Sequence, residues 1–90
     1  MPDGNIHLGH IVISSAGRDA GHTYVVVGWH KPQTLLVADG RGRKIAGPKK
    51  KNVKHVTRRS IANYVAQALN GGLRVTDEAI RQALAHIEDT

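Results

Sequence analysis

Short apolar runs, separated by turn residues about every 8–12 positions, are the feature that most limits how this chain can fold. Val, Ile and Leu dominate these runs, which is typical of short β-strands joined by tight turns. Several runs are apolar at consecutive rather than alternate positions, so we expect both faces of these strands to be covered. The pattern predicts five strands, at residues 8–15, 23–29, 34–38, 43–46 and 52–56.

Turn residues separate these runs for specific physical reasons. Pro32 fixes φ and lacks a backbone donor, so residues 30–33 are expected to form a turn. Asp39 and Gly40 tolerate positive φ, which favours a tight turn after the third strand. Residues 47–48, Gly-Pro, break the chain before a run of three lysines. Five strands at this spacing predict a small barrel, with another element packed on its outside.

The last third of the chain has the periodicity of helices. Apolar residues recur every three or four positions after Ser60, which is expected to cap the first helix. Residues 70–72, Asn-Gly-Gly, are expected to end this helix through a left-handed residue. Thr76 is expected to cap a second helix, whose first turn is acidic and so complements the helix dipole. The two predicted apolar stripes are Ile61, Tyr64, Val65, Ala68 and Leu69, and then Ile80, Ala83, Leu84 and Ile87.

Composition limits the core and the class of protein. A length of 90 residues predicts one domain. The chain has no Phe, one Trp and two Tyr, so Val, Ile, Leu and Ala are expected to fill the core. The lack of cysteine excludes disulfides and cysteine metal sites. The polar start does not resemble a signal peptide, and no apolar run approaches the roughly 18 residues of a membrane span, so a cytoplasmic protein without membrane contact is expected.

The charge of the chain is large and uneven. The formal net charge is +6. Residues 1–59 carry eleven basic and three acidic side chains, whereas residues 60–90 carry two basic and four acidic ones. Residues 41–59 contain nine basic residues and no acid. Such a segment is the electrostatic footprint of a nucleic-acid-binding protein.

Two glycines enclose an arginine and an aspartate between the first two predicted strands, in residues 17–21. Gly21 is expected to have positive φ, because glycine enters that region without the roughly 1–2 kcal/mol penalty of a Cβ atom. Asp19 is expected to bond to the backbone two residues further on. Turn chemistry does not require Arg18. Its planar guanidinium matches two phosphate oxygens, although a surface ion pair with Asp19 stays open as an alternative.

These segments resemble a known motif. Residues 9–13, 17–21 and 24–27 are similar to the KOW motif of ribosomal proteins and of NusG-type elongation factors. The sequence Val-Ala-Asp-Gly at residues 37–40 and the lysine run at 49–51 extend the resemblance. They are similar to the archaeal and eukaryotic large-subunit ribosomal protein fourteen-e family and its short bacterial relatives.

The resemblance implies a mainly β fold, with an SH3-like barrel (KOW domain) of about five strands over residues 6–57. A two-helix tail over residues 58–90 is expected to pack on this barrel. The resemblance also implies RNA binding, with ribosomal RNA of the large subunit as the expected partner and ribosomal proteins as further candidates. The motif often has a lysine where this chain has His22. The residues that match the structural turn of the motif are Gly9, Gly17, Asp19 and Gly21.

Basic side chains are the expected RNA contacts. The chain has few aromatic residues on which bases could stack, so recognition is expected to rest on phosphates and on RNA shape. We expect these side chains to be exposed. The predicted contacts are Arg18, His22, Lys31, Arg41, Arg43, Lys44, Lys49, Lys50, Lys51 and Lys54.

Catalysis and metal binding have less support in the sequence. No serine lies in a Ser-x-Gly elbow, and acids are scarce. Residues 42–48 have the glycine spacing of a P-loop, but Pro48 stands where that loop requires lysine. The six histidines lack metal-ligand spacing. We therefore expect no enzyme activity, no small-molecule substrate, no cofactor and no metal.

Two further binding functions compete with RNA binding. A DNA-reading helix-turn-helix is disfavoured, because Asp77 and Glu78 would place two carboxylates against the DNA backbone. A protein-binding module of the KOW/SH3-like type, acting in transcription or translation, stays open. In that case the basic residues would face an acidic partner.

Overall fold

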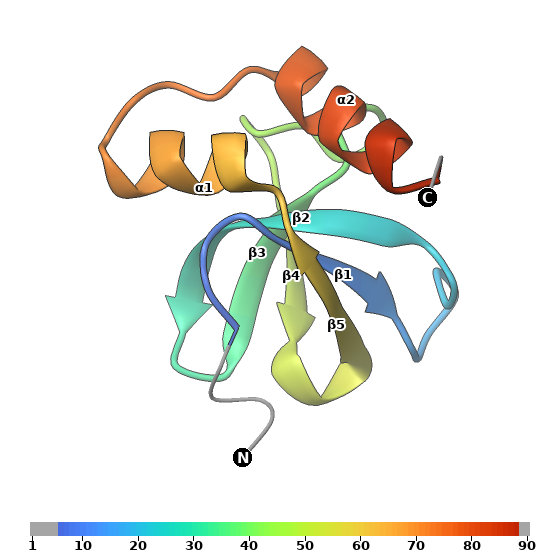
Figure 1. Ribbon diagram of the computed structural model, residues 1–90. Helices are drawn as coiled ribbons and strands as arrows, with labels where there is room; N and C mark the ends of the chain where they lie inside the picture. The colour runs from blue at the N-terminus through green and yellow to red at the C-terminus, as the bar shows by residue number, and fades with distance from the viewer. Residues whose placement is uncertain (1–5, 89–90) are drawn as a thin grey trace.

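The computed structural model describes residues 6–88, which form a five-stranded antiparallel sheet and two helices (Figure 1). The strand order is β4-β3-β2-β1-β5, so the first strand lies between the second and the last. This arrangement confirms a mainly β chain with a helical C-terminal part. The elements are β1 (His10–Ser14), β2 (Thr23–Lys31), β3 (Thr34–Ala38), β4 (Lys49–Asn52), the 3-10 helix η2 (Val53–His55), β5 (Val56–Ile61), α1 (Asn63–Asn70) and α2 (Asp77–Glu88).

The sheet is curled, because its two edge strands follow one another in the chain. A flat sheet of five strands would hold β4 and β5 about 19 Å apart. The short link through η2 reaches at most about 14 Å. Backbone hydrogen bonds tie this link to two distant turns: Val53 N donates to Gln33 O (3.0 Å), and Ser15 N donates to His55 O (2.8 Å). The curl gives the sheet an inner and an outer face.

An apolar core fills the inner face of the sheet. Val26, Leu35 and Val37 have no exposed surface. Tyr24 is the one aromatic side chain in this core, and the other members are aliphatic, as the composition predicts. The inner core consists of Ile6, Val12, Tyr24, Val26, Leu35, Val37, Val53 and Val56.

A second core lies between the outer face of the sheet and the helices, which both lie over the same side of the sheet in Figure 1. Ile11 and Val25 enter this outer core, whereas their chain neighbours Val12 and Val26 enter the inner one. The alternation explains why these strands are apolar at consecutive positions, and it confirms that another element packs on the outside. The buried members of the outer core are Ile11, Val25, Val65, Val75, Ile80 and Leu84.

The strand predictions hold in the first half of the sheet and fail in the second. The third strand has the predicted bounds, and the first two lie within about two residues of theirs. Residues 43–46 form no strand but belong to the β3–β4 loop, and residues 53–55 form η2 rather than part of a strand. The lysine run itself forms β4. The expected boundary at residue 57 falls inside β5, so the sheet extends to Ile61.

The first helix begins later than predicted. Ser60 lies in β5 and does not cap α1, which follows Ala62 without a side-chain cap. The predicted stripe is therefore only partly buried: Val65 is buried, whereas Ile61 is 39% and Tyr64 76% exposed. The strand continues through Ile61 because that residue pairs with the start of β1.

The later helix boundaries agree with the sequence. Gly72 has φ 74°, so a left-handed residue does end the α1 segment. Thr76 Oγ1 accepts a hydrogen bond from Ala79 N (3.1 Å), which confirms the cap of α2. Ile80 and Leu84 of the second stripe are buried, while the side chain of Ile87 lies outside the described residues.

Candidate nucleic-acid interface

The β1–β2 loop contains the glycines that the sequence singled out. Gly17 has φ 89° and Gly21 φ 91°, which confirms the left-handed conformation expected at Gly21. Gly21 N donates to Ser14 O (2.7 Å), and His22 N donates to Asp19 O (2.8 Å). The loop therefore folds back onto the end of β1, and Arg18 lies exposed at its tip.

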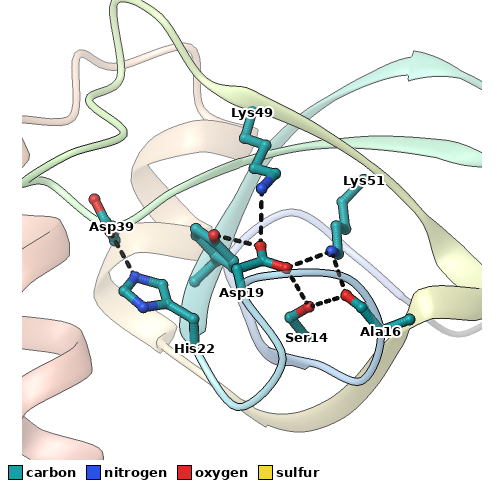
Figure 2. Close-up of polar contacts among 8 residues, drawn as sticks. Ser14, Ala16, Asp19, His22, Asp39, Lys49 and Lys51 are labelled. Carbon is teal, nitrogen blue, oxygen red and sulfur yellow. Dashed lines mark hydrogen bonds and ion pairs between the residues drawn. The ribbon is translucent and has the colours of Figure 1, made fainter.

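The Asp19 carboxylate is the centre of a polar cluster inside this loop (Figure 2). Its Oδ1 accepts hydrogen bonds from Ser14 Oγ and Lys51 Nζ, both at 2.8 Å. Its Oδ2 accepts one from the Tyr24 hydroxyl (2.6 Å) and pairs with Lys49 Nζ (3.0 Å). The prediction that this carboxylate bonds to the backbone two residues further on is therefore wrong. The side chain instead connects the β1–β2 loop to the edge strand β4.

This cluster changes the ionisation of its members. The Lys51 ammonium, followed by the Tyr24 hydroxyl, holds the pKa of Asp19 well below its usual range, although burial alone would raise that pKa. Burial, followed by the bond to Asp19, raises the pKa of the Tyr24 phenol above its usual value. Lys51 is only 8% exposed and also donates to Ala16 O (3.0 Å). The expectation that every predicted contact is exposed is thus wrong for Lys51.

A second carboxylate, Asp39, organises the β3–β4 loop. Its Oδ1 accepts hydrogen bonds from Arg41 N and Arg43 N, both at 2.9 Å, and its Oδ2 lies 2.7 Å from His22 Nε2. Burial would raise the pKa of Asp39, but the two amides and the imidazole more than offset it and hold that pKa below its usual value. The His22 contact ties the β1–β2 loop to the β3–β4 loop.

The structure divides the predicted contacts into three groups. Two loops joined by the His22–Asp39 contact carry the exposed side chains of Arg18, Arg41, Arg43 and Lys44. Lys49 and Lys51 point toward Asp19 instead. Lys50, on the same strand, is exposed, while Lys31 ends β2 and Lys54 lies in η2, which contacts the β2–β3 turn.

Some basic residues escaped the sequence prediction. Arg58 and Arg59 are exposed on β5, a segment that the sequence assigned to the approach to a helix. The β-branched residues Val56, Thr57 and Ile61 were the available signal for a strand. Trp29 is 40% exposed at the end of β2, whereas Tyr24 is buried and engaged with Asp19, so Tyr24 cannot serve as a stacking platform.

Two depressions lie beside these elements. A cavity of about 170 Å³ lies where α2 meets the two loops, with His22, Arg41 and Arg81 in its wall. A larger groove of about 690 Å³ runs between β5, the start of α1 and α2, with Tyr64 and Ile61 along it. Within residues 6–88 no three His, Asp or Glu side chains gather in a way that could hold a metal ion. None of the helices described is long and apolar enough to cross a membrane.

Comparison with known proteins adds no family to this description. No protein-family model matches the chain, and no curated protein matches it significantly. The similarity to the KOW motif therefore stays an expectation that depends on the residues quoted for it.

Proposed function

We propose that this protein binds structured RNA, and ribosomal RNA of the large subunit in particular, without catalysing a reaction. The observation that carries the proposal is the pair of joined loops with Arg18, Arg41 and Arg43 exposed on them. Arginine suits phosphate because its guanidinium donates two parallel hydrogen bonds. The Asp39 carboxylate binds the backbone of one loop, and the Asp19 carboxylate anchors the other loop through side chains. Less conformational entropy is therefore lost when these arginines meet RNA.

We further infer that the sheet is an SH3-like barrel of the KOW type in a cytoplasmic protein. Three observations support this inference: the order of the strands, the curl that brings the edge strands together, and the 3-10 turn η2 between the last two strands. The two glycines with positive φ on either side of Arg18 also fit the KOW loop.

The salt dependence of RNA affinity tests the proposal. We expect about five phosphate contacts, so log affinity for a structured RNA, such as a ribosomal RNA fragment with a duplex stem, should fall with log salt at a slope of roughly −3 to −5. Changing Arg18, Arg41 and Arg43 together to Ala should flatten this slope by about 2 to 3 units. Affinity should fall similarly for many RNA sequences, because phosphate contacts carry no sequence information.

A matched pair of single variants controls for net charge. Arg43→Ala removes one positive charge from the joined loops and should flatten the slope by about one unit. Arg74→Ala removes the same charge from the exposed link between α1 and α2 and should leave the slope unchanged. Equal slopes for the wild type and the triple loop variant would contradict RNA binding through these loops.

A protein-binding module is the second candidate, and the groove beside β5 favours it. Tyr64 is 76% exposed at the edge of this groove, and Ile61 is 39% exposed within it. Large exposed apolar side chains along a groove are typical of protein-binding surfaces. If the loop variants leave RNA binding unchanged while Tyr64→Ala abolishes capture of a protein partner, this second function is the correct one.

A further inference from the structure

Helix α2 contacts the β3–β4 loop at its two halves. Asp77 Oδ1 accepts a hydrogen bond from Ile45 N (2.8 Å), in the second half of the loop. Arg81 Nη1 donates to Gly40 O (2.7 Å), at the start of the loop. The Ile45 side chain also packs against the outer core that α2 helps to form. One turn of α2 therefore fixes both halves of the loop that carries Arg41, Arg43 and Lys44.

The contact is tight enough to require a particular residue. Gly40 has φ 77°, and a Cβ atom there would lie 2.5 Å from Asp77 O and 2.8 Å from Arg81 Cγ. Such distances are too short for any side chain, so the loop and the helix meet backbone to backbone at this point. Asp77 and Arg81 lie more than 30 residues from their loop partners in the chain, so this arrangement comes from the tertiary fold.

We propose that α2 is a brace that positions the β3–β4 loop for RNA, with Asp77 and Arg81 as positioning residues. This inference rests on the proposed RNA binding. Without the brace, the loop would keep the Asp39 contacts to its first half but lose the acceptor for Ile45 N. The basic side chains would then be spread over more conformations, and fixing them on RNA would cost additional entropy.

Asp77→Ala gives a test in which charge and positioning predict opposite results. Removing a carboxylate makes the protein more positive, so long-range electrostatics alone would strengthen RNA binding. Loss of the brace should instead weaken binding, by about three- to tenfold. Glu78→Ala is the matched control, because Glu78 lies next to Asp77 on the same helical turn, carries the same charge and is exposed. Its carboxylate contacts Gln82 rather than the loop. This control should bind RNA as the wild type does, or slightly more tightly.

Two additional measurements separate the brace from misfolding and from the proposed function. Asp77→Asn keeps an oxygen that can accept from Ile45 N, so it should restore most of the wild-type affinity. Amide hydrogen exchange without RNA reports the loop directly, and we expect exchange at residues 41–47 to be faster in Asp77→Ala than in Glu78→Ala. The buried residues 24–26 of β2 provide an internal reference for the fold.

The possible outcomes distinguish the two proposals. If Asp77→Ala binds RNA as tightly as Glu78→Ala, or if exchange at residues 41–47 is the same in both, the brace is wrong. If the wild type shows no salt-dependent RNA binding, the proposed function is wrong. In that case, faster amide exchange at residues 41–47 in Asp77→Ala would show only that α2 orders the β3–β4 loop. Weaker binding in Asp77→Ala together with faster exchange and rescue by Asp77→Asn supports the brace.

Discussion

Asp19 is a polar residue whose replacement should clearly destabilise this protein. Asp19→Asn keeps the size of the side chain and one acceptor oxygen but removes the negative charge. Lys51, whose side chain is 9% exposed, would then lack a counter-charge at 2.8 Å. The second lysine, Lys49, is 28% exposed and can turn toward water. The loss therefore comes mainly from one buried ammonium and from a weaker hydrogen bond of Tyr24, whose acceptor is no longer charged.

The magnitude follows from these burial values. Removing one partner of a buried ion pair costs about 3–5 kcal/mol. The Asp19 side chain is 15% exposed, and Asn can still accept one hydrogen bond, so we expect a loss of roughly 2–4 kcal/mol. For a domain of this size, such a loss lowers the melting temperature by roughly 10–25 °C. Thermal or urea unfolding followed by circular dichroism measures the change.

The same cluster predicts how stability depends on pH. The pKa of Asp19 is lowered in the folded protein, so its contribution is complete above the unfolded pKa, near 3.9. The contribution is lost as the pH falls through the lower folded pKa. The difference in unfolding free energy between the wild type and Asp19→Asn should therefore be constant near neutral pH and shrink below about pH 4.

A double-mutant cycle with Lys51→Met tests whether the ion pair is the cause. In the Lys51→Met background Asp19→Asn should cost much less, because no buried ammonium is left unpaired. Glu78→Gln, at an exposed carboxylate, is the control and should change stability by less than about 0.5 kcal/mol. A loss below 0.5 kcal/mol for Asp19→Asn, or equal losses in both backgrounds, would refute this account of how β4 is held.

Two glycine substitutions separate backbone strain from crowding. Gly21→Ala should lower the free energy of unfolding by about 1–2 kcal/mol. This loss comes from the φ of 91° alone, since nothing lies within 4 Å of the added Cβ. Gly42 is also in open space but has no positive φ, so Gly42→Ala should leave the thermal unfolding midpoint almost unchanged. Gly40→Ala should cost clearly more than Gly21→Ala, because it adds a collision with Asp77 and Arg81 to the same kind of strain. Equal melting temperatures for the Gly40 and Gly21 variants would show that the helix gives way easily.

Local signals in the sequence predicted the first half of the fold. The bounds of β3 and the positive φ at Gly21 follow from turn chemistry and from β-branched runs, which act over a few residues. The sequence did not predict a strand at the lysine run, because three consecutive charges suggested side chains exposed to solvent. Its place between Pro48 and Val53 nevertheless allowed a strand, in which Lys49 and Lys51 share one face.

The partners of the candidate site could not be predicted from the sequence. Asp19 and Lys51 are 32 residues apart, as are Ile45 and Asp77, and no local pattern connects them. Which lysine of the run is buried depends on the curl of the sheet, since the curl alone brings the edge strand β4 to the β1–β2 loop. Counting charges therefore located the basic segment but could not separate cations that hold the fold from those that face solvent.

The acidic residues explain how a chain with few of them can present a positive surface. Residues 1–59 contain three acids, and the two within the described part, Asp19 and Asp39, are almost covered by bonds to lysines, amides and an imidazole. The negative charge of residues 6–59 is therefore confined to the interior of the loops, while the loop arginines remain outside. Of the nine basic residues between positions 41 and 59, Lys49 and Lys51 are engaged with Asp19. A phosphate backbone thus meets fewer cations than the charge count suggests, and a salt slope near −8 would require β5 or the lysines of β4 to join the interface.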